Sequence, residues 1–210
     1  MKRIAWVVLL VVAAAAAATP RVTQAQADGK VAALYRHSYA AEAKQDFATA
    51  LARMREIRQA AGPSYFVTVR IAWLSYLAAD FKTSAAAYSE AIAADPKAIE
   101  PKLGLTLPLL ASRTWGELER ACRDVLALDA RNAAARARLA QAQYWSGNYP
   151  DAATTYRGLT AEYPSDLDYK TGLGWALLKM GRTAEARQLF DAVLAVSPDN
   201  TYARQGLAAK

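Results

Sequence analysis

The sequence has 210 residues, of which 54% are hydrophobic and 21% are charged, and it carries a formal net charge of +7. Residues 1–27 hold three basic side chains and no acid, so residues 28–210 carry 23 basic and 19 acidic groups. That balance is ordinary for a globular chain and gives no reason to expect nucleic acid as a partner. The single cysteine excludes an intramolecular disulfide and a cysteine-rich zinc cluster, and the single histidine excludes a site that needs two imidazoles.

Residues 1–27 have the three parts of an export signal. Lys2 and Arg3 form a short basic region, which is followed by an uncharged apolar run from Ile4 to Ala18. Ala25-Gln-Ala27 then supplies the small-x-small pattern that signal peptidases accept. We therefore predict a signal peptide over residues 1–27, cleaved after Ala27, and an exported, periplasmic protein.

The alternative is an uncleaved N-terminal segment that anchors the protein to the inner membrane, which is the only membrane association we expect. The apolar run has 15 residues. As a helix it would rise about 22 Å, less than the roughly 30 Å of a bilayer's hydrocarbon core, and this difference favours cleavage over a permanent span.

From Val31 onward the sequence repeats with a period of 34 residues. Five windows tile residues 31–200 without an insertion, and their bounds are 31–64, 65–98, 99–132, 133–166 and 167–200. Mostly apolar residues recur at the seventeenth, twentieth, twenty-fourth and twenty-seventh positions of the window, a spacing that places them on one face of a helix. At the twenty-fourth position they are Met54, Tyr88, Cys122, Tyr156 and Phe190.

Each window predicts two helices. In the first, a large residue is mostly followed by a small one, as at Leu173-Gly174, so that the second helix can approach closely. Good N-cap residues recur between the helices, at Asp46, Asp80, Thr114 and Asn148. Thr114 and Glu117 also have the spacing of a capping box. Proline recurs after the second helix, at Pro96, Pro164 and Pro198. It disfavours helix at the preceding residue, and no segment alternates with the period of a strand, so we expect no sheet.

This pattern resembles the tetratricopeptide repeat (TPR) family over residues 31–200, most closely in the second, fourth and fifth windows. The resemblance implies an all-α, right-handed superhelical solenoid of five helix–turn–helix repeats, with eleven helices in all. Residues 201–210 continue the pattern for part of a window and are expected to form a C-terminal capping helix over the last apolar face. The first window departs from the family pattern at His37, and the third departs at Pro108, where a kink in the helix is expected.

No set of side chains predicts catalysis. His37 occupies a position that is leucine or isoleucine in the other windows, so we expect it to be packed. Cys122 lies at an apolar position of a second helix and is expected to be buried. Gly172-Leu-Gly174 lacks the third glycine and the preceding strand of a dinucleotide-binding loop. We predict a protein that is not an enzyme and that uses no cofactor and no metal.

The resemblance also implies a binding surface, because the first helices of TPR arrays line a concave face. The side chains that would point into this groove are largely apolar and aromatic, with arginines along one edge. The candidate partner-binding residues are Tyr35, Tyr39, Phe66, Arg70, Trp73, Tyr76, Leu107, Arg138, Trp145 and Trp175. We expect the three tryptophans to be exposed on the groove. For Tyr76 and Tyr144, exposure on the groove and packing between neighbouring helices are equally favoured.

These features favour a non-enzymatic scaffold in the cell envelope that binds a protein partner, either a peptide segment or an amphipathic helix of an envelope complex. The lysine and asparagine with which the family's best-known grooves hold a C-terminal carboxylate are missing from the matching positions, so such a clamp is disfavoured. The alternative is a carbohydrate-binding accessory protein of an exopolysaccharide synthesis or export system, because tryptophans also stack on sugar rings.

Overall fold

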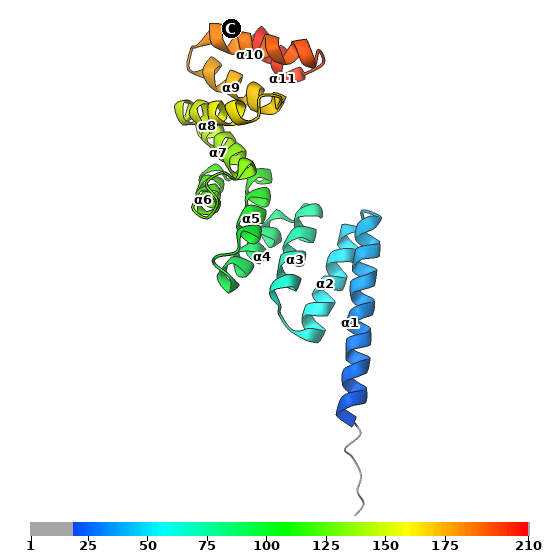
Figure 1. Cartoon of the computed structure of the whole chain (residues 1–210). Coiled ribbons are helices and arrows are strands. Elements are labelled where there is room, and N and C mark those ends of the chain that lie inside the picture. The colour runs from blue at the N-terminus through cyan, green and yellow to red at the C-terminus, as the bar shows by residue number, and fades with distance from the viewer. Residues whose placement is uncertain (1–18, 210) are drawn as a thin grey trace, which may run out of the picture.

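The structure, a computed structural model, describes residues 19–209. Over this range the chain forms eleven α-helices and no strand, which confirms the all-α prediction (Figure 1). The helices are α1 (Thr19–Ala43), α2 (Phe47–Ala61), α3 (Tyr65–Leu77), α4 (Phe81–Ala94), α5 (Ile99–Ala111), α6 (Trp115–Leu126), α7 (Ala133–Trp145), α8 (Tyr149–Glu162), α9 (Leu167–Lys179), α10 (Thr183–Val196) and α11 (Thr201–Ala208). Most of the predicted signal peptide, residues 1–18, lies outside the described residues.

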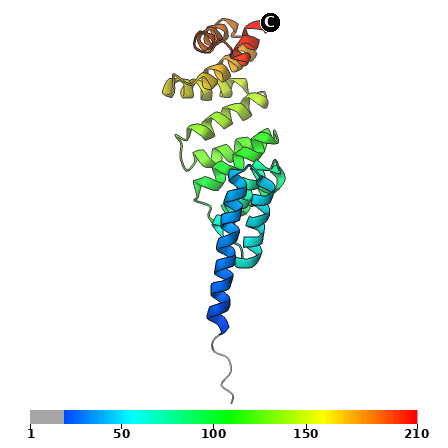
Figure 2. The same cartoon turned by 90° about the vertical axis from the view of Figure 1, so that its right-hand side faces the viewer.

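The first helix is longer than the repeat pattern predicts. It begins at Thr19, well ahead of Val31, and continues through the predicted cleavage site at Ala27. Figures 1 and 2 show the N-terminal part of α1 extending beyond α2. None of the helices from Thr19 onward combines the length and the apolar character that crossing a bilayer requires.

Five helix pairs and a final helix build the solenoid. Starting from Tyr65 of α3, the helices α5, α7, α9 and α11 each begin 34 residues after the preceding odd-numbered one. Each helix packs against the next along the chain, and from α3 onward each odd-numbered helix also contacts the next odd-numbered one. Within the described chain the even-numbered helices make no such contacts with one another. The odd-numbered helices therefore line the tighter, concave side of the superhelix, and Figure 2 shows the stacked pairs from the side.

The turns inside the five repeats share one backbone conformation. The fifteenth residue of each window has a positive φ, between 57° and 83°, and these residues are Gln45, Ala79, Arg113, Gly147 and Gly181. Only the last two are glycines, which adopt this conformation without strain. In the first three repeats a side chain is held in the left-handed region, at a cost of about 1 kcal/mol each.

Asp46, Asp80, Thr114 and Asn148 all occupy the N-cap position that the sequence predicted for them. Only two of the four side chains accept a capping hydrogen bond. Asp46 and Asp80 each accept a hydrogen bond from the backbone amide three residues later, and these bonds lower the pKa of both carboxyl groups. Thr114 instead donates its hydroxyl hydrogen to the carbonyl of Leu109, at 3.2 Å. The predicted capping box with Glu117 is therefore wrong, because the Thr114 hydroxyl is turned back toward the preceding helix.

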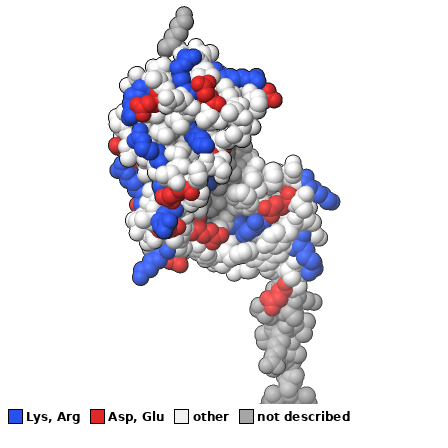
Figure 3. Space-filling model, turned by 45° about the horizontal axis from the view of Figure 1, so that its top comes forward, with Lys and Arg blue, Asp and Glu red and all other residues white. Residues whose placement is uncertain are grey.

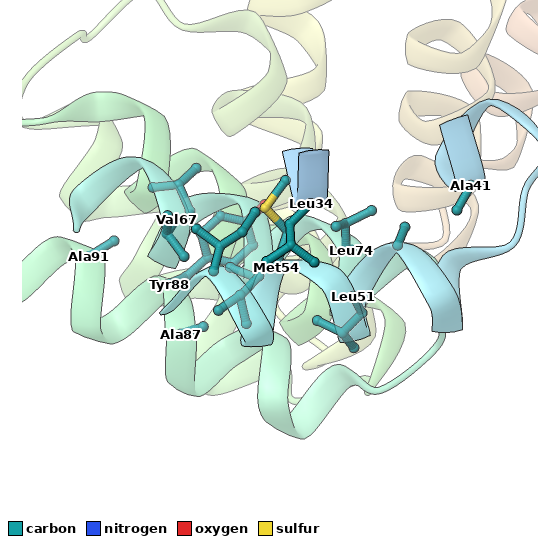
Figure 4. Close-up of a cluster of buried hydrophobic side chains, with 14 residues drawn as sticks. Leu34, Ala41, Leu51, Met54, Val67, Leu74, Ala87, Tyr88 and Ala91 are labelled. Carbon is teal, nitrogen blue, oxygen red and sulfur yellow. The ribbon is translucent and has the colours of Figure 1, made fainter. Parts of the chain in front are cut away.

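Buried apolar side chains form three clusters along the solenoid, over α1 to α4, α5 to α7 and α8 to α11. Figure 4 shows the first, in which Met54 and Tyr88 meet residues from the neighbouring helices. Met54, Cys122 and Phe190 are fully buried, and Tyr88 nearly so. The burial expected for Cys122 is thus confirmed.

Large rings at the twenty-fourth position of one repeat face glycines at the sixth position of the next. A Cβ atom on Gly104 would lie 2.3 Å from the Tyr88 ring, and one on Gly172 would lie 2.5 Å from the Tyr156 ring. Gly206 of α11 faces Phe190 in the same way, with a separation of 2.3 Å. The rings occupy this space, so only glycine fits opposite them.

At the other two junctions between neighbouring repeats, both the ring and the glycine are replaced by other residues. The twenty-fourth position holds Met54 or Cys122, and the sixth position of the following repeat holds Arg70 or Arg138. Where a ring is missing, an arginine takes the position of the glycine. The first four junctions therefore alternate between an arginine and a ring with a glycine, and the fifth junction, at the capping helix, again has a ring and a glycine.

Two local expectations from the sequence are corrected or refined. His37 is exposed rather than packed, since at the first repeat no earlier helix covers its face of α1. Pro108 is buried inside α5, which continues unbroken from Ile99 to Ala111.

Candidate partner-binding groove

The concave side contains a groove of about 550 Å³ between α7, α9 and α11, which we call the C-terminal groove. It is lined by Ala137, Arg138, Gln141, Tyr144, Trp145, Tyr156, Asp168, Tyr169, Thr171, Gly172, Trp175, Tyr202 and Gln205. Six of these residues are aromatic and two are charged. Figure 3 shows the hollow between the two ends of the solenoid, where uncharged surface is interspersed with charges of both signs.

The residues predicted from the sequence fall into two groups. Arg138, Trp145 and Trp175 line the C-terminal groove. Six others lie on α1 and α3 at the opposite end, and we call them the N-terminal cluster: Tyr35, Tyr39, Phe66, Arg70, Trp73 and Tyr76. Leu107 lies on α5 between the two groups and is partly buried. The structure thus separates what the sequence suggested as one lining into two aromatic regions.

Side chains bridge α1 and α3 in the N-terminal cluster. The rings of Tyr35 and Phe66 lie 6.0 Å apart, and the Arg70 guanidinium lies 4.9 Å from the centre of the Tyr39 ring. Arg70 also donates to the carboxylate of Glu42 in a largely buried ion pair. The charge of Arg70 is therefore already neutralised, and this arginine is not the free basic edge that was expected.

Trp73 belongs to the same network. Its Nε1–H donates to the second oxygen of the Glu42 carboxylate at 3.1 Å, and its ring lies 5.8 Å from that of Tyr76. Trp73 also packs against the buried cluster of the first two repeats. This residue is therefore only partly exposed and contributes to the structure of the N-terminal repeats.

Of the three tryptophans expected on the surface of the groove, Trp145 is the most exposed, at 58%. It stacks on Trp115, with ring centres 5.9 Å apart and planes 15° apart, and it meets Tyr144 edge to face. Trp175 is partly buried, with its ring 5.8 Å from that of Phe190. Trp145 thus offers an open aromatic surface whose orientation its neighbours fix, whereas Trp175 serves the core as well.

Arg138 is also committed to contacts within the protein. It donates to the carbonyl oxygen of Leu103 at 3.2 Å and to the hydroxyl of Thr106 at 2.6 Å, both on α5. Burial lowers the pKa of the guanidinium. The sixth-position arginines that were expected to form a basic edge therefore tie neighbouring repeats together at 70 and 138, and only Arg36 of this set is exposed.

Several lining residues were missed from the sequence, among them Tyr202 and Gln205 on the capping helix. Continuing the 34-residue windows past Asn200 puts these two at the second and fifth positions, the same positions that face the groove in the other repeats. Tyr202 is 67% exposed. The capping helix is therefore a wall of the groove as well as a cover for the core.

Reactive and metal-binding chemistry has little support among residues 28–209. Burial raises the pKa of the Cys122 thiol to about 12, so this thiol is protonated at neutral pH. No group of three or more histidine, cysteine, aspartate or glutamate side chains in this range could hold a metal ion.

Comparison with known proteins agrees with this architecture. A model of the tetratricopeptide repeat family matches residues 138–201 and, in an overlapping placement, residues 171–209. Among curated proteins, none matches the sequence closely enough to count as a relative.

Solved structures share the fold over most of the chain. A tetratricopeptide repeat protein from Parabacteroides merdae ATCC 43184 has a TM-score of 0.77 at 12% identity, over 85% of this chain and 71% of that one. YrrB, described as a TPR protein with an unusual peptide-binding site, has a TM-score of 0.74 at 13% identity, over 89% and 97%. MamA from Desulfovibrio magneticus RS-1 has a TM-score of 0.75 at 13% identity, over 82% and 97%. At these identities the likeness concerns the fold alone.

The family model matches the C-terminal third of the chain, and the described residues as a whole have the fold of tetratricopeptide repeat proteins, a solenoid of five helix pairs with a C-terminal capping helix. The TPR fold in turn favours a protein–protein interaction scaffold.

Proposed function

We propose that this protein is a non-enzymatic scaffold that binds a peptide segment or an amphipathic helix of a protein partner in its C-terminal groove. The observation that carries the proposal is Trp145, a 58% exposed ring on the concave side that is held in place by stacking on Trp115. Rigid, exposed aromatic residues bury much apolar area at little cost in side-chain entropy and are frequent hot spots of interfaces.

The size of the groove supports a small contact. Its volume of about 550 Å³ is that of a pocket for a small molecule or a few side chains, and six aromatic rings line it. One face of an amphipathic helix presents three or four apolar side chains at a spacing of three and four residues. Such a face would fill the groove without a change in the solenoid.

The partner contact is best tested at Trp145. Replacing Trp145 by alanine should weaken binding at least about fivefold, since a buried interface tryptophan commonly contributes about 1 kcal/mol or more. The melting temperature should change little because the ring is mostly exposed. The measurement is affinity capture from envelope extract, followed by titration of peptides that tile the captured protein.

Leu128→Ala is the matched control for this experiment. Leu128 is also an exposed apolar residue, but it lies after α6 and outside the groove. Equal binding by the wild-type protein and Trp145→Ala would refute the groove as the site of contact. Trp73 and Trp175 are poorer probes, because their replacement also removes contacts within the protein.

We further propose that the scaffold works in the periplasm as part of an envelope complex. The support is the basic start, the apolar run and the Ala25-Gln-Ala27 pattern of residues 1–27. The exported protein should begin at Asp28, and intact-mass measurement of the envelope fraction checks this. Retention of Met1 would replace the free periplasmic form with one anchored to the inner membrane.

Carbohydrate binding is the second candidate function. It is favoured by the open face of Trp145 together with the amides of Gln141 and Gln205 in the same groove. Rings that stack on sugars and amides that hydrogen-bond to hydroxyl groups would serve an accessory protein of exopolysaccharide synthesis or export. Titration with soluble hexasaccharides of glucose and of N-acetylglucosamine, followed by tryptophan fluorescence, distinguishes this function from peptide binding.

A further inference from the structure

The lining of the C-terminal groove contains one basic and one acidic side chain, and only the acidic one is exposed. Only Arg138 and Asp168 among its lining residues are charged, and Arg138 is held by its hydrogen bonds to α5. Asp168 lies in the first turn of α9 and is exposed. Its carboxylate makes no hydrogen bond or ion pair with the described residues, since the N-cap of α9 is Asp166. The helix dipole stabilises a negative charge in the first turn of α9, but this interaction does not occupy the carboxylate oxygen atoms of Asp168, which can still bind a ligand in the groove.

Aromatic rings line the same part of the groove as this carboxylate. Burial raises the pKa of the Tyr156 and Tyr169 hydroxyl groups, and the charge of Asp168 adds to this mainly at Tyr156. At Tyr169 the charge of Asp166 contributes more than that of Asp168, and Arg136 acts in the opposite direction. Trp175 and Tyr202 complete the lining around them. The faces of such rings attract cations, and a neighbouring carboxylate adds to that attraction. A lysine or arginine side chain, with an aliphatic stem and a cationic end, matches this combination.

The same lining is less suited to an anionic ligand. Arg138 keeps its positive charge, but it is partly buried and its Nη1 is held by two oxygen atoms of α5, whereas the Asp168 carboxylate is exposed. The other donors among the polar lining side chains are neutral amides and hydroxyl groups. The two lysines of α9, Lys170 and Lys179, do not belong to the lining of the groove. The side chains that a ligand would touch therefore favour positive charge over negative charge.

We propose that the C-terminal groove selects an amphipathic helix that carries lysine or arginine beside its apolar face, with the cation against Asp168 and the apolar side chains against Trp145 and Trp175. This inference rests on the proposed function and adds the charge of the partner to it. It predicts that peptide binding depends on the sign of one charge and on salt.

The test uses three synthetic helical peptides with identical leucine positions and with lysine, glutamine or glutamate beside the leucine face. They are titrated into residues 28–210 in 50 mM and 500 mM salt and followed by tryptophan fluorescence. The lysine peptide should bind about three- to tenfold more tightly than the glutamine peptide at low salt, and the glutamate peptide should bind most weakly. The advantage of lysine should shrink at high salt because exposed charges are screened.

Asp168→Asn should abolish the preference for lysine and leave the affinity for the glutamine peptide unchanged. The control is Glu117→Gln, which removes an exposed first-turn acid from α6, outside the groove, and changes the net charge equally. Equal binding of the lysine and glutamine peptides would overturn the charge preference while leaving the scaffold function standing. Preference for lysine that survives in Asp168→Asn would also overturn it. If none of the three peptides binds, the proposed function itself fails.

Discussion

Replacing Phe190 by alanine should lower the free energy of unfolding of the C-terminal repeats by about 3 to 5 kcal/mol. Phe190 is fully buried on α10, and its ring lies against Gly174 of α9 and Gly206 of α11. It also meets the edge of Trp175. Glycines have no side chains that can move into the space, so the substitution leaves a cavity among three helices.

Urea unfolding followed by circular dichroism measures this loss. Because each repeat contacts only its neighbours, the fifth repeat and the capping helix should unfold before the others, and the transition should broaden or divide. Tyr202→Ala is the control, since it removes an aromatic ring that is 67% exposed and should cost much less. A loss below about 1 kcal/mol for Phe190→Ala would contradict the placement of this ring in the core.

The repeat period determined most of the fold at the level of the sequence. A period of 34 with apolar residues on one face of each second helix is a strong constraint, because all five windows must satisfy the same packing. Burial at Cys122 and Phe190 followed from their shared position in the window. The pattern is informative here because neighbouring repeats present nearly the same surroundings to each of these side chains.

Interactions between side chains of different repeats were harder to predict from the sequence. Arg70 and Arg138 look like a basic edge in the sequence, yet each is bound by groups from the preceding repeat, Glu42 in one case and Thr106 in the other. The sequence places a side chain on a face of its helix but does not tell which group meets it across the next helix. Similarly, Thr114 has the spacing of a capping box, but the nearby Leu109 carbonyl takes its hydroxyl hydrogen.

The candidate site was predictable in part for the same reason. The rings that follow the repeat positions, such as Trp145, were found, whereas the wall contributed by Tyr202 required the pattern to be extended into an incomplete window. The repeat pattern could not predict the exposed fraction of each tryptophan, because this fraction depends on the rings and acids of the neighbouring helices.

The alternation between rings and arginines gives the second large expected effect. Cys122→Tyr places a ring at the twenty-fourth position of the third repeat, as in the second and fourth, but Arg138 occupies the space opposite. We expect this substitution alone to cost about 1 to 3 kcal/mol through overpacking. Arg138→Gly alone should cost about 2 kcal/mol, because it leaves Thr106 without its donor, creates a cavity and adds a glycine to α7.

The double variant Cys122→Tyr with Arg138→Gly recreates the pair that Tyr156 and Gly172 form at the next junction along the chain. Its unfolding free energy should exceed the sum expected from the two single variants by about 2 kcal/mol, a coupling that only contacting residues show. Gly172→Ala is the matched control: an added Cβ would lie 2.5 Å from the Tyr156 ring, so this variant should lose stability although alanine favours helix. Urea unfolding of the four proteins measures the coupling. Additive losses at positions 122 and 138 would show that the ring and the arginine do not compete for the same space, and the alternation in the sequence would then have another cause.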